Sequence, residues 1–366
     1  MKTLSEQLAS RSREADLYEI IDGNRVRCFA CGHRCPIPAG FAGVCKVRFN
    51  RAGKLYAPWG YVSGVQVDPI EKKPFFHVLP GARALSFGML GCDLHCGYCQ
   101  NWVTSQALRD FRSSLDFIPA EPEQLIGAAL KARAQVVVST YNEPLITAEW
   151  AVAVFREARK AGLMTGFVSN GNATPEVLDY LRPWLDLYKV DLKSFSDRSY
   201  RQLGGRLQPI LDSIRRIHAM GFWLEVVTLV VPGFNDSDEE LKAIASFLAG
   251  ISPDIPWHVT AFHKDYKMLG PENTPLSTLL RAADIGNAAG LRYVYAGNLR
   301  GLGTRENTLC HGCGATLVER AGFHVVRDRL GDSGRCPDCG TAIPGIWKSS
   351  PRPAGETDLL ISKRCG

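Results

Sequence analysis

This sequence of 366 residues lacks several features that would assign it to common classes of protein. No run of 18 apolar residues occurs, and residues 1–23 are polar without the apolar core of a signal peptide, which argues against a membrane span and a secretory leader. No long Lys/Arg run accompanies the net charge of +6, so the charge does not point to nucleic acid and is equally compatible with small anionic substrates. We therefore expect a soluble, cytoplasmic protein.

Cysteine, in contrast, is abundant and clustered. Twelve cysteines occur, and in an intracellular chain such clusters favour metal binding over disulfides. They form groups of four, three and four, with Cys365 alone in the tail. The groups are Cys28, Cys31, Cys35 and Cys45; Cys92, Cys96 and Cys99; and Cys310, Cys313, Cys336 and Cys339. This distribution predicts two closed metal sites on either side of an open one.

The central group has the spacing C-x3-C-x2-C, with Tyr98 directly before the third cysteine. A [4Fe–4S] cube has four irons and is normally held by four thiolates. Cys92, Cys96 and Cys99 would hold three of them, and the open iron can chelate a molecule with adjacent amine and carboxylate groups, such as the methionyl end of S-adenosylmethionine (SAM). The alternatives are a zinc knuckle and chance clustering. The loop resembles the signature of the radical SAM superfamily, in which the cluster splits SAM into methionine and a 5′-deoxyadenosyl radical.

Short apolar runs alternate with helical patterns between about residues 84 and 297, which predicts a parallel α/β fold. Strands are expected at 84–90, 135–139, 165–169, 187–191, 223–230, 257–261 and 292–295, and helices at 123–133, 148–161, 175–181, 207–220, 238–248 and 276–289. Thr174 is a predicted helix cap, and Ser237 to Glu240 is a predicted capping box. Six such units favour a partial (β/α)6 barrel, with a doubly wound sheet as the alternative.

Polar residues follow three further strands, and each is a candidate SAM contact. Glu143, followed by proline, matches the end of the superfamily's Gly-Gly-Glu-Pro-like segment, which receives the SAM amino group. Ser169 and Asn170 offer hydrogen bonds to SAM hydroxyls or its carboxylate. Asp191 and Lys193 share one face of the chain and resemble the D-x-K segment of glycyl-radical-enzyme activases, which implies ribose or cation binding by Asp191 and carboxylate binding by Lys193. The alternatives are a helix-starting loop, a structural Asn-Gly turn and a surface salt bridge.

Two departures from those families stand beside these matches. Tyr141 and Asn142 replace the two glycines of the superfamily segment. Val168 occupies the position at which the activases carry an Asp that helps hold a monovalent cation, which counts against a bound cation and against a strict activase identity. His258 and His263, near the end of the sixth predicted strand, are candidates to face the substrate, with a structural role as the alternative.

The outer cysteine groups predict closed sites. Cys310, Cys313, Cys336 and Cys339 form two C-x2-C-G knuckles 22 residues apart, the pattern of a zinc ribbon, with rubredoxin-type iron as the competitor. Cys28, Cys31, Cys35 and Cys45 have the spacing C-x2-C-x3-C-x9-C, which suits zinc or an auxiliary iron–sulfur cluster. The expected parts are therefore an N-terminal metal module (1–65), the barrel (66–300), a ribbon (301–347) and a disordered tail (348–366).

Over residues 18–347 the order of these motifs resembles the radical SAM member of the AmmeMemoRadiSam system. The likeness rests on the N-terminal cysteines with Gly43 to Arg48, on residues 68–74, on Cys99 to Trp102, on Thr140 to Pro144, and on the ribbon ending at Trp347. It implies SAM as radical source, Memo-like and AmmeCR-like partners, and an electron donor such as flavodoxin or ferredoxin. Residues 68–74 are expected either to line the site or to form a surface turn.

Three functions follow from these observations. The first is an enzyme that cleaves SAM reductively and abstracts hydrogen from a substrate the sequence does not specify. The second is an activase that makes a glycyl radical on a partner. The third is a non-catalytic metal scaffold or electron carrier, which would not bind SAM.

Overall fold

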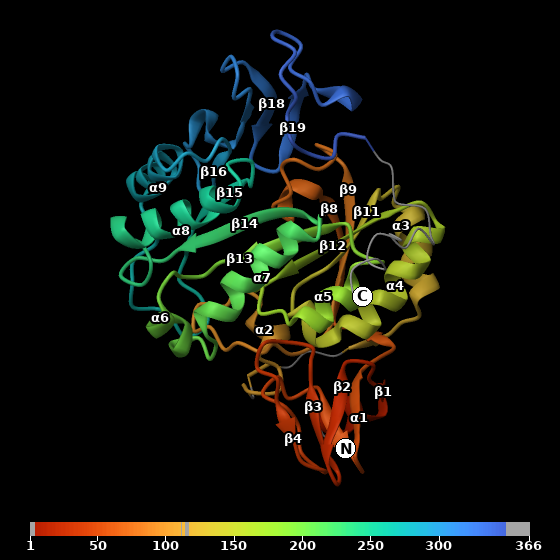
Figure 1. The fold of residues 1–366 in the computed structure, drawn as a ribbon. Coiled ribbons are helices and arrows are strands. Elements are labelled where there is room, and N and C mark those ends of the chain that lie inside the picture. Colours follow the sequence, from red (N-terminus) through yellow and green to blue (C-terminus); the bar gives the residue numbers. More distant parts are fainter. Residues whose placement is uncertain (1–3, 111, 114–116, 349–366) are drawn as a thin grey trace, which may run out of the picture.

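The computed structural model describes residues 4–110, 112–113 and 117–348. Figure 1 shows a central α/β body with a small β-rich part at each end, N-terminal at one end and C-terminal at the other. The predicted disordered tail, apart from Lys348, and Cys365 lie outside the described residues. Within the described part of the chain, every helix is too short or too polar to span a lipid bilayer.

The central body contains an eight-stranded sheet whose strand order follows the chain. Its strands are β8 (Gly64–Pro69), β9 (Arg83–Gly88), β11 (Val136–Ser139), β12 (Met164–Ser169), β13 (Leu187–Asp191), β14 (Trp223–Val230), β15 (Trp257–Ala261) and β16 (Val294–Gly297). The seven strands from β9 to β16 are parallel, and β8 pairs antiparallel with β9. Because this order never reverses, the alternative of a doubly wound sheet is wrong.

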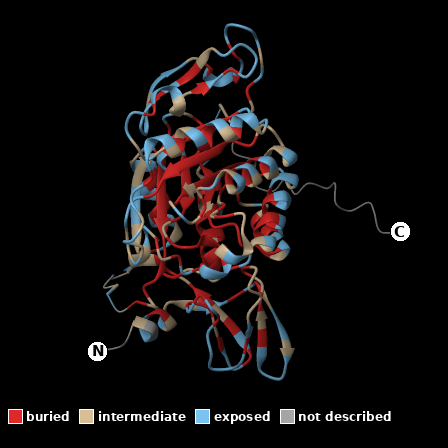
Figure 2. Ribbon diagram, turned by 90° about the vertical axis from the view of Figure 1, so that its left-hand side faces the viewer, coloured by how far each residue is buried: buried red, intermediate tan, exposed pale blue. Residues whose placement is uncertain are grey.

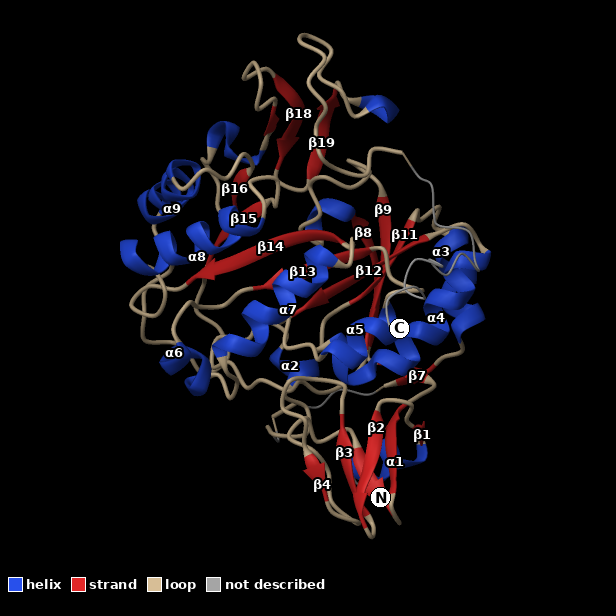
Figure 3. Ribbon diagram, in the orientation of Figure 1, coloured by secondary structure: helices blue, strands red, loops and turns tan. Residues whose placement is uncertain are grey.

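Helices fill the connections between the parallel strands, as the sequence predicts (Figure 3). They are α3 (Pro122–Lys131), α4 (Ala148–Lys160), α5 (Pro175–Leu181), α6 (Asp197–Gln202), α7 (Leu207–Ala219), α8 (Asp238–Ile251) and α9 (Leu276–Ala288), with the short α2 (Trp102–Ser105) after the cysteine loop. The edge strand β8 and helix α6 were not among the sequence predictions. Right-handed connections between sequential neighbours place such helices on one face of a sheet.

One of the two predicted caps is complete. Thr174 Oγ1 accepts a hydrogen bond from Val177 N at 3.2 Å, as expected. Ser237 likewise accepts from Glu240 N at 3.2 Å. However, the Glu240 carboxylate accepts hydrogen bonds from Ser194 Oγ and Phe195 N, so the predicted reciprocal half of the capping box is wrong. The Glu240 side chain, which the local pattern assigned to the cap, binds a distant segment instead.

The two faces of the sheet carry different side chains, because successive residues of a strand point to opposite sides. Phe167 of β12 packs against Phe155 of α4, on the helix-covered face. Its neighbour Val168, and Lys189 of β13, line a cavity on the other face. Figure 2 shows that the buried residues concentrate in this sheet and its helices, whereas the two end parts are largely exposed.

The N-terminal part consists of short strands around the first cysteine group. It contains α1 (Leu4–Ser10), β1 (Ser12–Glu14), β2 (Tyr18–Asp22), β3 (Arg25–Cys28), β4 (Pro36–Ile37), β5 (Phe49–Arg51) and β6 (Lys54–Pro58), arranged as sheets β1-β6-β5 and β2-β3-β4, while β7 (Tyr61–Val62) pairs with β10 (Ile118–Pro119). A buried ion pair joins this part to the body: Arg48 donates to both oxygens of Glu149 at 2.6 and 2.7 Å. Removing one partner of such a pair leaves an uncompensated buried charge, so this contact fixes the module on α4.

The C-terminal part is a three-stranded antiparallel sheet, β17 (Thr308–Leu309), β18 (Thr316–Ala321) and β19 (His324–Asp328). A chain of hydrogen bonds ties it to the body. Arg320 donates to Thr308 Oγ1 at 2.9 Å, and the hydroxyl groups of Thr308 and Tyr295 lie 2.9 Å apart. His77 continues the chain, with Nε2 2.6 Å from the Tyr295 hydroxyl and Nδ1 2.6 Å from Pro344 O. This chain is satisfied when His77 is neutral and donates from Nδ1.

The buried position of His77 predicts a pH-dependent stability. Burial lowers the pKa of His77 from about 6.5 to about 4. The unfolded ring therefore binds a proton at a higher pH than the folded ring does, so the free energy of unfolding should fall by up to about 3 kcal/mol as pH drops from 6.5 to 4. Urea titrations at pH 7 and pH 4.5 should show a smaller decline for His77→Gln than for wild type. His324→Gln, at an exposed position of the hairpin, should retain the wild-type decline; an equal decline in all three proteins would contradict the assignment.

Candidate active site

The nine residues predicted to hold the cluster and SAM line one cavity of about 420 Å³ at the carboxyl ends of the parallel strands. These residues are Cys92, Cys96, Tyr98, Cys99, Glu143, Ser169, Asn170, Asp191 and Lys193. They come from four segments spread over about 100 residues, and only the fold brings them together. Lys72, Lys73 and Pro74, the last three of residues 68–74, also line the cavity.

The cysteine loop after β9 presents three sulfurs to this cavity. Leu94 N donates to Cys92 Sγ at 3.4 Å, and Cys99 Sγ lies 3.2 Å from Ser105 Oγ. Burial raises the pKa of Cys92, Cys96 and Cys99, while the charge of Lys193 opposes this shift at Cys96 and Cys99. Buried thiolates need cationic partners, and three of them on one loop beside an open cavity suit a cluster with one exposed iron.

Glu143 lies in a dry, donor-rich position after β11. Its carboxylate accepts hydrogen bonds from Ser169 Oγ at 2.7 Å, Asn170 N at 2.8 Å and Leu145 N at 3.1 Å. Burial, and then the nearby charge of Asp93, raises the pKa of Glu143. An ammonium group placed here would stabilise the ionised form, so the carboxylate is suited to receive an amine.

Asp93, within the cysteine loop, was not among the predicted site residues. It is 1% exposed, and its two oxygens accept hydrogen bonds from Asn170 Nδ2 and Asn172 Nδ2, both at 2.7 Å. His33, between two N-terminal cysteines, lies 3.2 Å from the backbone oxygen of Asp93. Asp93 therefore joins the cysteine loop to the end of β12 and to the N-terminal part.

Three charged side chains meet at the end of β13. Asp191 accepts a hydrogen bond from Lys189 Nζ, and its other oxygen is 3.6 Å from Lys193 Nζ. Burial disfavours the charge of Lys193, but Asp191 and then Cys96 outweigh it and raise the Lys193 pKa well above its usual value. The predicted salt bridge thus exists, but it lies in the cavity wall and includes Lys189, which was not predicted.

Tyr141, which replaces a glycine of the superfamily segment, keeps the backbone conformation that favours glycine. Tyr141 has a φ of 70°, in the left-handed region that favours glycine, where the superfamily segment has glycine. Its hydroxyl lies 3.2 Å from Lys73 Nζ, and its backbone oxygen accepts a hydrogen bond from Thr104 Oγ1 at 2.9 Å. These contacts hold the strained residue in place beside Glu143.

The two candidate histidines have structural partners. His258 lies within β15 rather than after it, is 3% exposed, and has Nε2 2.7 Å from Glu225 Oε2. His263 is exposed, with Nε2 3.0 Å from Gln100 Nε2. Neither candidate lines the cavity that contains the cysteine loop, whereas His258 lines an adjoining cavity of about 380 Å³. The position of His258 in its strand did not reveal that its imidazole is hydrogen-bonded to Glu225.

Of the two outer cysteine groups, the C-terminal one is assembled. The sulfurs of Cys310, Cys313, Cys336 and Cys339 all lie within 4.8 Å of one another, with Cys310–Cys339 at 3.6 Å and Cys313–Cys336 at 3.7 Å. A tetrahedral ion with metal–sulfur bonds of about 2.3 Å needs sulfurs about 3.8 Å apart, so these four fit one ion. Among the described residues, the sulfurs of the N-terminal group are not gathered in this way, because no three of them lie within 4.8 Å of one another.

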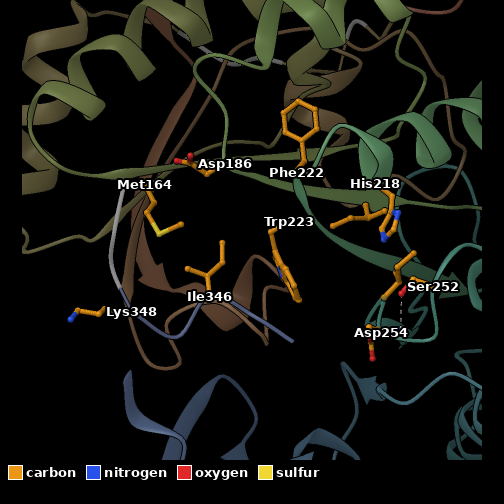
Figure 4. A pocket seen from close by; sticks show the side chains of 12 residues that line it. Met164, Asp186, His218, Phe222, Trp223, Ser252, Asp254, Ile346 and Lys348 are labelled. Atoms are coloured by element: carbon orange, nitrogen blue, oxygen red, sulfur yellow. Dashed lines mark hydrogen bonds between the residues drawn. The ribbon is translucent and has the colours of Figure 1, made fainter. Parts of the chain in front are cut away.

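Two further cavities border the sheet. One of about 470 Å³ lies at the amino-terminal ends of the strands, where Met164, Asp186 and Trp223 line it (Figure 4), and none of the predicted site residues does. The other, of about 380 Å³, is lined by the body and the ribbon and shares Pro74, Thr260, Asn298 and Phe323 with the cavity of the cysteine loop. It therefore adjoins the candidate active site.

A parallel sheet with three thiolates, an amine acceptor and paired lysines at its carboxyl edge defines a cluster-dependent enzyme class. Residues 88–248 match the model of the radical SAM superfamily. An uncharacterized protein of Methanocaldococcus jannaschii is 35% identical over 334 residues, which cover 90% of this chain and 98% of that protein. The chain belongs to the radical SAM superfamily, whose members use a [4Fe–4S] cluster and SAM.

Partial likenesses extend to activating enzymes. The isethionate sulfite-lyase activating enzyme of Oleidesulfovibrio alaskensis is 30% identical over 123 residues, covering 32% of this chain and 40% of that enzyme. A solved domain of a pyruvate-formate lyase-activating enzyme from Bacteroides vulgatus is 21% identical, covers 44% of this chain and 98% of that domain, and superposes with a TM-score of 0.40.

The hydrogen bond to Cys99 predicts a role for Ser105 in the potential of the cluster. Gln106 Nε2 lies 3.2 Å from Ser105 Oγ, which leaves the hydroxyl proton free to donate to a thiolate at Cys99. Such a bond stabilises the extra negative charge of a reduced cluster, so Ser105→Ala should lower the reduction potential by ~tens of mV. An EPR-monitored redox titration of the reconstituted protein measures this shift. Thr104→Val, which removes a hydroxyl that bonds backbone oxygens, is the control, and an equal shift in both variants would contradict the prediction.

Proposed function

We propose that this protein is a radical SAM enzyme that cleaves SAM reductively and uses the resulting 5′-deoxyadenosyl radical to abstract hydrogen from a substrate. The observation that supports this most strongly is the meeting of all nine predicted cluster and SAM residues in one cavity. Cys92, Cys96 and Cys99 would hold the cluster, which supplies the electron for SAM cleavage. The proposal includes a curved, partial-barrel arrangement of the open sheet and a cytoplasmic location.

The residues of the chain would bind and orient SAM rather than react with it. Glu143, whose carboxylate is oriented by hydrogen bonds from Ser169 Oγ and Asn170 N, would accept the amino group of SAM. Ser169 and Asn170 would bind its hydroxyls or its carboxylate, while Lys193 would bind its carboxylate and Asp191 its ribose. Tyr98 is 3% exposed and packs edge-on against Phe234 with ring centres 5.7 Å apart, which gives the cavity an apolar wall. Such burial excludes water from a radical.

The first test is SAM cleavage. The wild-type protein, reconstituted anaerobically with iron and sulfide and then given SAM and dithionite, should produce 5′-deoxyadenosine. Cys96→Ala should produce none, because the two remaining thiolates cannot hold the three irons that a stable cluster with one open iron requires. Chromatographic quantification of 5′-deoxyadenosine measures the outcome. If wild-type protein with a full cluster yields no more 5′-deoxyadenosine than Cys96→Ala does, the proposal is wrong.

An activase of a glycyl-radical enzyme is the second candidate. It is favoured by the partial identity to activating enzymes and by the match of Asp191 and Lys193 to the activase segment. Val168 and the two additional cysteine modules count against it. The third possibility, a metal scaffold or electron carrier, predicts that the reconstituted protein does not bind SAM, which a binding titration would reveal.

We place the protein, as part of this proposal, in an AmmeMemoRadiSam-type system with Memo-like and AmmeCR-like partners and a flavodoxin or ferredoxin as electron donor. The ordered motifs over residues 18–347 support this placement. The ribbon would hold structural zinc, which the sulfur separations of 3.6 and 3.7 Å suit. The N-terminal group would hold zinc or an auxiliary iron–sulfur cluster.

Metal analysis should separate the outer sites. Cys310→Ala should lose about one equivalent of zinc per chain and retain its iron, because one missing thiolate opens a closed four-ligand site. Cys28→Ala should lose a different equivalent, of zinc or of iron, and retain the ribbon zinc. Elemental analysis of the two purified variants beside wild type measures this, and each variant is the control for the other. Unchanged metal content in both would contradict the two closed sites.

A further inference from the structure

Lys189 is a buried lysine in the cavity wall that the predicted site does not use. It is 4% exposed and lines the cavity with Asp191 and Lys193. In the sheet it lies beside Val168 of β12 on one side and Glu225 of β14 on the other. A charged lysine is rarely this deeply buried without partners, so its acceptors are informative.

Glu225 is not available as the partner of Lys189, because its carboxylate is already occupied. It accepts hydrogen bonds from Phe76 N, His77 N and Trp223 Nε1, each at 3.0 Å, and lies 2.7 Å from His258 Nε2. These four contacts fill the acceptor sites of a carboxylate. Val168 offers no acceptor at all, so Lys189 must find its partners on its own strand or in the cavity.

Asp191 is the hydrogen-bond acceptor of Lys189 among the residues that the structure describes. The same carboxylate also lies 3.6 Å from Lys193 Nζ. Two ammonium groups therefore share one carboxylate, and the cluster of three side chains carries a net charge of +1. An ammonium has three donors, and Lys189 uses one of them here. The remaining donors face the cavity, where an anion could accept them.

We infer that Lys189 is a built-in cation that acts with Lys193 to hold the carboxylate of SAM beside Asp191. This inference rests on the proposed function, which puts the SAM amino group at Glu143, two strands away from β13. A monovalent metal ion would otherwise be needed to balance the charge of Asp191 and an incoming carboxylate. The side chain of Lys189 supplies that positive charge, and the side chain of Val168 has no oxygen that could bind a metal ion. SAM binding is then independent of the alkali cation in solution.

The experiment measures the dissociation constant of SAM for the reconstituted full-length protein, without reductant, by equilibrium dialysis. Buffers contain potassium, sodium or tetramethylammonium as the only monovalent cation. The wild-type constant should agree within about twofold across the three buffers. Lys189→Met, which keeps the length of the side chain and removes its charge, should weaken SAM binding at least tenfold, since a charge-assisted contact is lost. Lys189→Arg should lie between the two.

Two further variants separate a cation from a merely structural lysine. Lys264→Met removes one positive charge outside the cavity, where this lysine pairs with Glu272, and should bind SAM within about twofold of wild type. The double variant Val168→Asp with Lys189→Met places a second carboxylate next to position 189, in the same cavity wall as Asp191, and should bind SAM well only in potassium or sodium. Iron content and circular dichroism confirm that each variant is folded and loaded.

The outcomes are distinct. Wild-type binding that depends on potassium or sodium, or Lys189→Met binding at the wild-type level with a full cluster, overturns the role of Lys189 and leaves the proposed function intact. A double variant that is insensitive to the cation also overturns it. A wild-type protein that binds SAM in none of the buffers overturns the proposed function, and the inference falls with it.

Discussion

The buried carboxylate of Asp93 is the contact on which the candidate site depends. It receives hydrogen bonds from Asn170 and Asn172, which are 77 and 79 residues away in the chain, and so fixes the cysteine loop against the end of β12. Through its backbone oxygen and His33 it also fixes the N-terminal part against the same loop. Its charge raises the pKa of Cys31 and Cys92 alike, after burial does so, which places two predicted metal sites within the field of one side chain. Burying an acid there is tolerable because both oxygens are satisfied.

Much of the body was predictable because its signals are local. Apolar runs identified β13, β14 and β15 with the bounds that the structure has, and the loop of Cys92, Cys96 and Cys99 lies within eight residues. The residues that follow parallel strands meet at one edge for geometric reasons, so Glu143, Asn170 and Lys193 could be placed near the cysteines without knowledge of the fold.

The rest depended on contacts between distant segments. Glu225 resembles any acid in a strand, yet it binds His258 and two backbone amides of another loop, a contact that no local pattern predicts. Lys189 was not predicted as a site residue, because the residues around it in the sequence do not show whether a lysine in an apolar run is buried or exposed. The order of the strands, which decides against a doubly wound sheet, is likewise a property of pairing rather than of pattern.

The separation of charges in the cavity has a consequence for any ligand with the ends of an amino acid. Glu143 lies beyond β11, and Lys189 with Lys193 lies on and beyond β13, with β12 between them. Neighbouring strands are about 4.8 Å apart, so one intervening strand separates the backbones that carry the acidic and basic ends of the cavity. This separation of charge favours a bound zwitterion with its ammonium group toward Glu143 and its carboxylate toward the lysines. Under the proposed function, free methionine carries the same two charged groups as SAM, would be aligned in the same way, and would compete with the next molecule of SAM for the cavity.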